Sequence, residues 1–215
     1  RQVMAREGPV MNSGPHYPIP YPADAAGSWG LGKALKPITH PLRSNVPIFL
    51  GAEGPKNVAL AAEVCDGWYP LFYSPFREEV YRDSIAGRPE GFEILCPVHI
   101  HVTDDLEAGR LEVKQNIALY VGGMGSRDRN FHNKLISRMG FGDAAKRIQD
   151  LYLDRQKTAA VAAVPDDLVD EVSLVGPKEM IRQRLAAWED SAVTGLLVWP
   201  KTMDDIATFA ELVLN

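Results

Sequence analysis

The feature that most constrains this chain is a repeated change from a short apolar run to a stretch with helical spacing. Apolar runs begin near residues 46, 68, 94 and 196, and an amphipathic helical pattern follows each of them. Short apolar runs bounded by turn residues are typical of strands buried on both faces of a parallel sheet. Four strand–helix units therefore predict an α/β fold built on a parallel sheet.

The first of these units contains the most distinctive motif of the chain, Gly51-Ala52-Glu53-Gly54-Pro55-Lys56. It lies between a predicted strand at 46–50 and a helix that should begin at Gly54-Pro55, because proline is favoured at the first helical position. The backbone amides of a helix N-terminus attract anions, Gly51 and Gly54 allow close approach, and Lys56 adds a positive charge. The motif predicts a phosphate site, although many (β/α)8 barrels, one of the folds built from such strand–helix units, have this loop without a ligand.

The other units have their own start and stop signals. We expect helices over 75–86, from the cap Thr103-Asp104-Asp105 to Gly122-Gly123, from Gly176-Pro177 onward, and over 204–214. The carboxylate pairs at 104–105, 166–167 and 204–205 are interpreted as helix starts rather than as paired catalytic acids.

The first 45 residues differ in character from the rest. The segment up to Glu7 reads as the end of a helix stopped by Gly8-Pro9, which predicts further sequence upstream of Arg1. A proline- and glycine-rich irregular segment follows, with only a weak helical stretch around 31–35. Such a segment is either a functional lid or partner surface, or a plain surface insertion.

Charge and cysteine content exclude several classes of function. A net charge of -5 and a pI near 5.6 disfavour nucleic acid or a membrane surface as the partner. Cys65 and Cys96 form neither a disulfide framework nor a zinc pattern, which favours a reduced, cytoplasmic setting. No apolar stretch is long enough to span a membrane, and no export signal is visible. A P-loop, a Gly-x-Gly-x-x-Gly fingerprint, a hydrolase elbow and a His-Glu-x-x-His motif are also missing.

Two segments, in the expected order, resemble the luciferase-like oxidoreductases that use the deazaflavin F420. They are Val46-Pro47-Ile48-Phe49-Leu50-Gly51-Ala52-Glu53-Gly54-Pro55-Lys56 with Leu60-Ala61-Ala62-Glu63 and Asp66-Gly67-Trp68, and Leu174-Val175-Gly176-Pro177-Lys178-Glu179 with Ile181, Leu185 and Thr194-Gly195-Leu196-Leu197-Val198. Together they span most of residues 46–214. The first resembles the fifth and sixth βα units of the family, and the second its closing helix and eighth strand.

The resemblance implies a TIM (β/α)8 barrel of which this chain supplies the C-terminal half, strands 5–8. Residues 46–215 would form that half, with a helical insertion at about 122–170, and residues 1–45 the helix end and irregular segment. The cofactor would be F420, or alternatively FMN, with its phosphate at Gly51, Ala52, Glu53, Gly54, Pro55 and Lys56. Family catalytic groups, often on the early strands, have no counterpart here, so we expect them upstream of Arg1.

Two further groups of side chains are weaker candidates. His99 and His101 point to one face of a predicted strand, but without a third ligand they are better interpreted as packing or barrel-interior hydrogen-bonding residues than as a metal site. Arg127, Arg129 and His132 lie in a glycine-rich segment that could face a substrate or form a solvated loop. We expect no metal.

Three functions remain open on this basis. The first is hydride transfer between F420 and an organic small molecule of unknown identity. The second is an FMN-dependent luciferase-like monooxygenase. The third, of another class, is a non-catalytic truncated paralogue or partner subunit. Exposed strand edges of a half barrel require pairing, so a homo-oligomer is expected.

Overall fold

The computed structural model describes residues 1–214 and divides the chain into two compact units, Arg1–Ile48 and a second unit beginning at Phe49. The first unit contains one short helix, α1 (Gln2–Ala5), and is otherwise irregular, with isolated bridges from Val10 to Leu35 and from Asn12 to Ile19. The weak helix expected around 31–35 is wrong. Gly32 lies in the left-handed region at φ 57°, which breaks a right-handed helix, and Leu35 pairs with Val10 instead.

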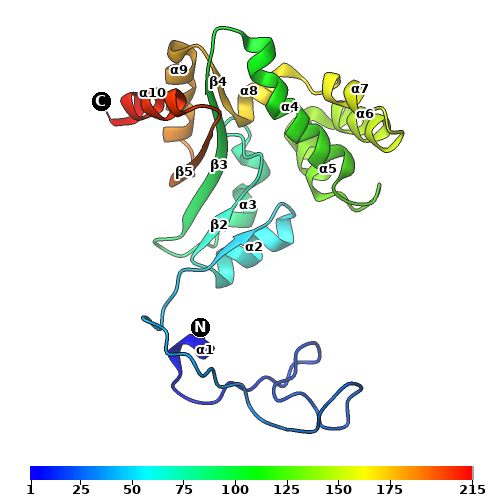
Figure 1. The fold of residues 1–215 in the computed structure, drawn as a ribbon, viewed down its shortest axis with the longest axis vertical. Helices are drawn as coiled ribbons and strands as arrows, with labels where there is room; N and C mark the ends of the chain where they lie inside the picture. Colours follow the sequence, from blue (N-terminus) through cyan, green and yellow to red (C-terminus); the bar gives the residue numbers. More distant parts are fainter. Residues whose placement is uncertain (215) are drawn as a thin grey trace. The chain divides into compact units, whose positions relative to one another are not determined.

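The second unit is an α/β structure around a parallel sheet (Figure 1). Its strands are β1 (Phe49–Gly51), β2 (Gly67–Tyr69), β3 (Glu93–Val102), β4 (Leu174–Gly176) and β5 (Gly195–Pro200). Beyond the β1–β2 pair, β3 pairs with β2 near Glu93, with β5 over Leu95–Ile100 and with β4 over Ile100–Val102. The four predicted strands are confirmed, and the three-residue β4 was missed. Strand β1 starts later than expected because Pro47 has no amide for the ladder.

The second unit has nine α-helices within the described residues. They are α2 (Pro55–Val64), α3 (Arg82–Ile85), α4 (Leu106–Gly123), α5 (Phe131–Ile136), α6 (Gly142–Leu153), α7 (Lys157–Ala162), α8 (Asp166–Val172), α9 (Lys178–Glu189) and α10 (Met203–Leu214). A 3-10 turn, η1, covers Glu78–Val80, and a π-type turn, η2, covers Ser137–Phe141. In Figure 1, α4 to α7 gather on one side of β3 and α9 and α10 on the other. None of these helices is long and apolar enough to cross a membrane.

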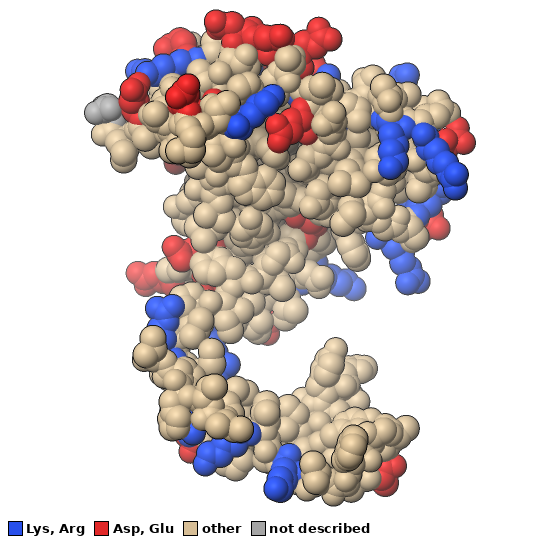
Figure 2. Space-filling view, viewed as in Figure 1, with Lys and Arg blue, Asp and Glu red and all other residues tan. Residues whose placement is uncertain are grey.

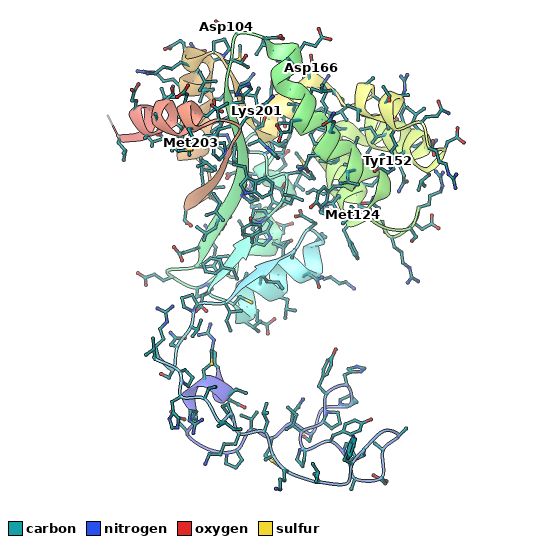
Figure 3. The ribbon with its side chains drawn as sticks, viewed as in Figure 1. Asp104, Met124, Tyr152, Asp166, Lys201 and Met203 are labelled. Carbon is teal, nitrogen blue, oxygen red and sulfur yellow. The ribbon has the colours of Figure 1, made fainter. Side chains whose placement is uncertain are left out.

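Most predicted helix starts and stops are confirmed. Asp105 caps α4, because its Oδ1 accepts from the amide of Ala108 at 3.0 Å. The same helix ends at Gly123, where the two terminal glycines let the ring of Tyr152 pack closely (Figure 3). Helices α8 and α10 begin at or next to their carboxylate pairs, as expected.

The continuous helix expected over 75–86 is wrong, because this segment forms only η1 and α3. Side-chain hydrogen bonds determine the shape of this segment instead. Glu78 Oε1 accepts from the Tyr73 hydroxyl at 2.7 Å and from the amide of Ala192 at 2.6 Å, a residue far along the chain. Such contacts override helical periodicity, which is a weak signal over so few turns.

The core lies on one face of β3, where Ile94, Cys96, Val98 and Ile100 are fully buried or nearly so. On the opposite face Leu95 and His99 are only half-buried, although Pro97 between them is buried. The sheet is therefore covered by packed helices on one face and leaves part of the other face accessible near the strand ends.

Close strand packing in the sheet depends on Gly67. A Cβ at this position would lie 2.6 Å from the carbonyl of Glu93 and would overlap the ring of Phe49. We expect Gly67→Ala to lower the free energy of unfolding by about 2 kcal/mol, because the backbone contact cannot relax. Urea unfolding measures this. The control is Gly87→Ala, where a Cβ meets nothing within 4 Å, and equal midpoints for the two variants would contradict the prediction.

Candidate functional site

The predicted motif forms the connection between β1 and α2. Gly54 is the N-cap of α2 with extended backbone at φ −79° and ψ 139°, and Pro55 occupies the first helical turn. The carbonyl of Gly54 accepts from the amides of Asn57 and Val58, both at 3.0 Å. The N-terminal end of a ten-residue helix therefore opens at the carboxyl end of a parallel strand, where ligands commonly bind in α/β folds.

Three hydrogen bonds hold this connection in place. Trp68 Nε1 donates to the carbonyl of Ala52 at 2.8 Å, and Arg138 Nη2 donates to the carbonyl of Glu53 at 2.9 Å. The amide of Leu71 donates to Glu53 Oε1 at 2.7 Å. Both loop carbonyls are thus bound by donors, so their negative ends do not compete with an anion at the helix N-terminus.

A cationic cleft of about 460 Å³ opens beside the start of α2. Its charged walls are Lys56 from α2, Lys134 from α5 and Arg138 from η2. Within residues 1–214 none of the three forms an ion pair, and Arg138 donates to the backbone carbonyl of Glu53. Figure 2 shows mainly Lys and Arg among the charged side chains on the side of α5 and α6. Cations with no carboxylate partner around a helix N-terminus favour an anionic ligand.

An aromatic cleft of about 440 Å³ adjoins the cationic one and shares Gly54, Asn57 and Phe131 with it. Its other walls come from β1, β2, β5, α4, α5 and the connections after β1 and β2: Gly51, Ala52, Glu53, Tyr69, Leu71, Tyr120, His132 and Trp199. Clefts lined by aromatic rings with a few polar groups suit flat, mostly apolar ligands. The two clefts together fit a molecule with a planar part and an anionic part.

Glu53 differs from the rest of the motif because its side chain points into the protein. The residue is only 9% exposed, and burial raises the pKa of its carboxyl from 4.5 to about 8, against the lowering effects of the Leu71 amide and Arg138. Its Oε2 is buried without a hydrogen-bond partner. Gly54, Pro55 and Lys56 line the cationic cleft, whereas the carboxyl of Glu53 braces the connection from beneath.

The two histidines on β3, His99 and His101, have different surroundings. His99 packs edge-on against Trp199 at 5.0 Å, while His101 Nδ1 lies 3.2 Å from the carboxylate of Asp205. Among the described residues no group of three or more potential ligands could hold a metal ion. Asp205, predicted as a helix start, also accepts from the amide of Val102 at 2.7 Å and so ties α10 to β3.

Of the three candidates in the glycine-rich segment, His132 lines the aromatic cleft. Its ring packs edge-on against Tyr120 at 4.9 Å and Phe72 at 6.0 Å, and burial lowers its pKa. Arg127 instead forms an ion pair with Asp150. His132 is therefore a neutral wall residue of the aromatic cleft.

The sequence interpretation missed Lys134 and Arg138, which lie about eighty residues after the motif. Their spacing of four residues, typical of one helical face, was the available signal. It indicated a shared face, but not that this face would lie against the start of α2.

The family model described as luciferase-like monooxygenase matches residues 4–195. A putative coenzyme F420-dependent oxidoreductase of Mycobacterium tuberculosis is 45% identical, over 99% of this chain and 63% of its own length. A 5,10-methylenetetrahydromethanopterin reductase of Archaeoglobus fulgidus is 25% identical, over 60% of this chain and 44% of its own. The chain thus spans less than two thirds of the length of these relatives.

Two solved structures show the same fold. The coenzyme F420-dependent tetrahydromethanopterin reductase from Methanopyrus kandleri aligns with 99% of this chain and 58% of its own at a TM-score of 0.69 and 21% identity. An F420-dependent secondary alcohol dehydrogenase aligns with 99% of this chain and 57% of its own at a TM-score of 0.60 and 16% identity.

Proposed function

Because this chain belongs to the luciferase-like monooxygenase family, we propose that it works as an F420-dependent oxidoreductase transferring a hydride between the deazaflavin and an organic small molecule. The observation that carries the proposal is the pair of adjoining clefts at the start of α2, one cationic and one aromatic. The relative that is 45% identical bears the name of an F420-dependent oxidoreductase, which supports F420 over other cofactors.

The residues present fit a phosphate-bearing planar cofactor. Lys56, Lys134 and Arg138 supply positive charge and form no ion pair within the described chain, and the α2 N-terminus adds amide donors. We propose that Gly51, Ala52, Glu53, Gly54, Pro55 and Lys56 form the phosphate connection, with Glu53 acting through its carboxyl beneath the loop.

Beside the phosphate, the rings of Tyr69 and Trp199 would orient the planar part and exclude water. When bound, F420 supplies a site that donates or accepts a hydride. The chain's part is binding, orientation and shielding.

For the architecture, we propose that residues 46–215 are the C-terminal half of a TIM barrel, strands 5–8, with the helices of about 122–170 as an insertion. Strands β1, β2, β3 and β5 pair in parallel one after the next with helices between them, as successive barrel strands do, and the three-residue β4 pairs in addition with the end of β3. The groups that complete the catalytic site would then come from the other half of the barrel. Pairing of the sheet edges in a homo-oligomer and a cytoplasmic setting are part of the same proposal.

Cofactor retention tests the proposal. The full-length protein is mixed with F420 or with FMN, desalted, and its visible absorbance recorded. We expect F420 to be retained and FMN to be lost. Retention of FMN alone would favour a flavin-dependent monooxygenase, and retention of neither would overturn both and favour a non-catalytic paralogue or partner subunit.

A further inference from the structure

Glu53 is a buried acid directly beneath the proposed anion site. Its Oε1 accepts the Leu71 amide at 2.7 Å, while Oε2 is buried without a partner. An ionised carboxylate in this position would leave one charged oxygen without a donor, which is costly in a water-free environment. The neutral acid avoids that cost, because a proton on Oε2 removes the charge.

The groups that face Glu53 come from three separate parts of the chain. Arg138 from η2 donates to the Glu53 carbonyl and is the cation that acts on its carboxyl. Tyr81, between η1 and α3, and Cys96, on β3, also interact with the carboxyl electrostatically. Burial raises the pKa of the Tyr81 hydroxyl and of the Cys96 thiol, so both stay neutral. Of these three groups, Arg138 is thus the one that carries a charge, and it lies both near the Glu53 carboxyl and at the surface cleft.

Arg138 also lines the cationic cleft, so it connects the buried Glu53 carboxyl with the proposed anion site. With Glu53 neutral, the Arg138 guanidinium is held by a carbonyl and its charge is available to an anion. With Glu53 ionised, the carboxylate attracts the same guanidinium and repels an anion bound above it. The protonation state of one buried side chain therefore alters the charge presented at the start of α2.

We propose that Glu53 is a positioning residue that couples anion binding at the α2 N-terminus to its own proton, so that the anion binds with Glu53 neutral and leaves as Glu53 ionises. This inference rests on the proposed function, because it requires the anion site. By linkage, anion binding above neutral pH takes up a proton from solvent. The full positive charge of the cleft is presented only while the carboxyl stays neutral.

Binding measured as a function of pH tests this coupling. Sulfate is the first probe because its own charge does not change across the range, and F420 is the second. For a carboxyl that titrates near pH 8, the dissociation constant of the full chain should rise about 10-fold between about pH 7 and about pH 9. The Glu53→Gln variant, which keeps the oxygen that accepts from Leu71, should change by less than about 2-fold.

Two controls separate this coupling from general charge effects. Glu63→Gln, on the exposed face of α2, removes the same charge and should keep the full 10-fold dependence. Calorimetry of the unmodified chain in buffers of different ionisation enthalpy should also detect proton uptake on binding near pH 8.5, without any variant.

The results would separate failure of the Glu53 coupling from failure of the anion site itself. Binding at pH 7 that persists unchanged at pH 9, or an equal dependence in Glu53→Gln, would overturn the role of Glu53 and leave the anion site standing. If neither sulfate nor F420 binds at pH 7, the anion site and the coupling fall together.

Discussion

Replacing Lys56, Lys134 and Arg138 together by alanine is expected to weaken F420 binding by about 100-fold. Each side chain brings one positive charge to the same cleft and forms no ion pair within residues 1–214. Charge-assisted contacts at a partly exposed site contribute about 1 kcal/mol each, so three of them account for about 3 kcal/mol. Fluorescence or calorimetric titration of the purified variant measures the loss.

The matched control removes the same number of charges elsewhere. Arg82, Arg147 and Arg155 are exposed and line neither cleft, so their joint replacement by alanine should leave the affinity within about 2-fold. Since Arg138 also holds the Glu53 carbonyl, a variant that changes only Lys56 and Lys134 keeps that bond intact. At about 1 kcal/mol for each of the two side chains it should still lose about 30-fold, and unchanged affinity in this variant would show that the cleft does not hold the anion.

The Glu53→Gln variant is expected to gain stability over the unmodified chain as pH rises. The Glu53 carboxyl has a pKa of about 8 in the folded protein against 4.5 for an ordinary glutamate. Between these values the unfolded chain releases a proton that the folded chain retains. The free energy of unfolding of the unmodified protein therefore falls from pH 4.5 to pH 8, by up to about 5 kcal/mol. The glutamine side chain does not titrate, so the free energy of unfolding of the variant lacks this fall with pH.

Urea unfolding at several pH values checks the prediction, because all other ionisable groups are common to both proteins. The difference between variant and parent should grow between pH 4.5 and pH 8 and stay constant above. The exposed Glu63→Gln change should give a difference that hardly varies with pH. A constant difference for Glu53→Gln as well would mean that Glu53 is ionised in the folded state.

Local sequence patterns were enough to predict the main elements of the second unit. Strands β1, β2, β3 and β5 appear as apolar runs, and Gly54-Pro55 and Asp105 mark the starts of α2 and α4. Capping and burial on both faces of a strand depend on neighbours in sequence, which explains this success. The segment over 75–86 failed because bonds from Glu78 to distant residues decide its shape.

The motif Gly51 to Lys56 shows where the limit lies. Its glycines, its lysine and its place between a strand and a helix predict an anion site from the sequence alone. That Glu53 turns inward under Leu71, and that Lys134 and Arg138 come to the same helix start, was decided only by the packing of α5 and η2 beside α2. The amide donors at the start of α2 come from neighbouring residues in the sequence. The burial of Glu53 and the nearby charges of Lys134 and Arg138 exist only once the chain has folded.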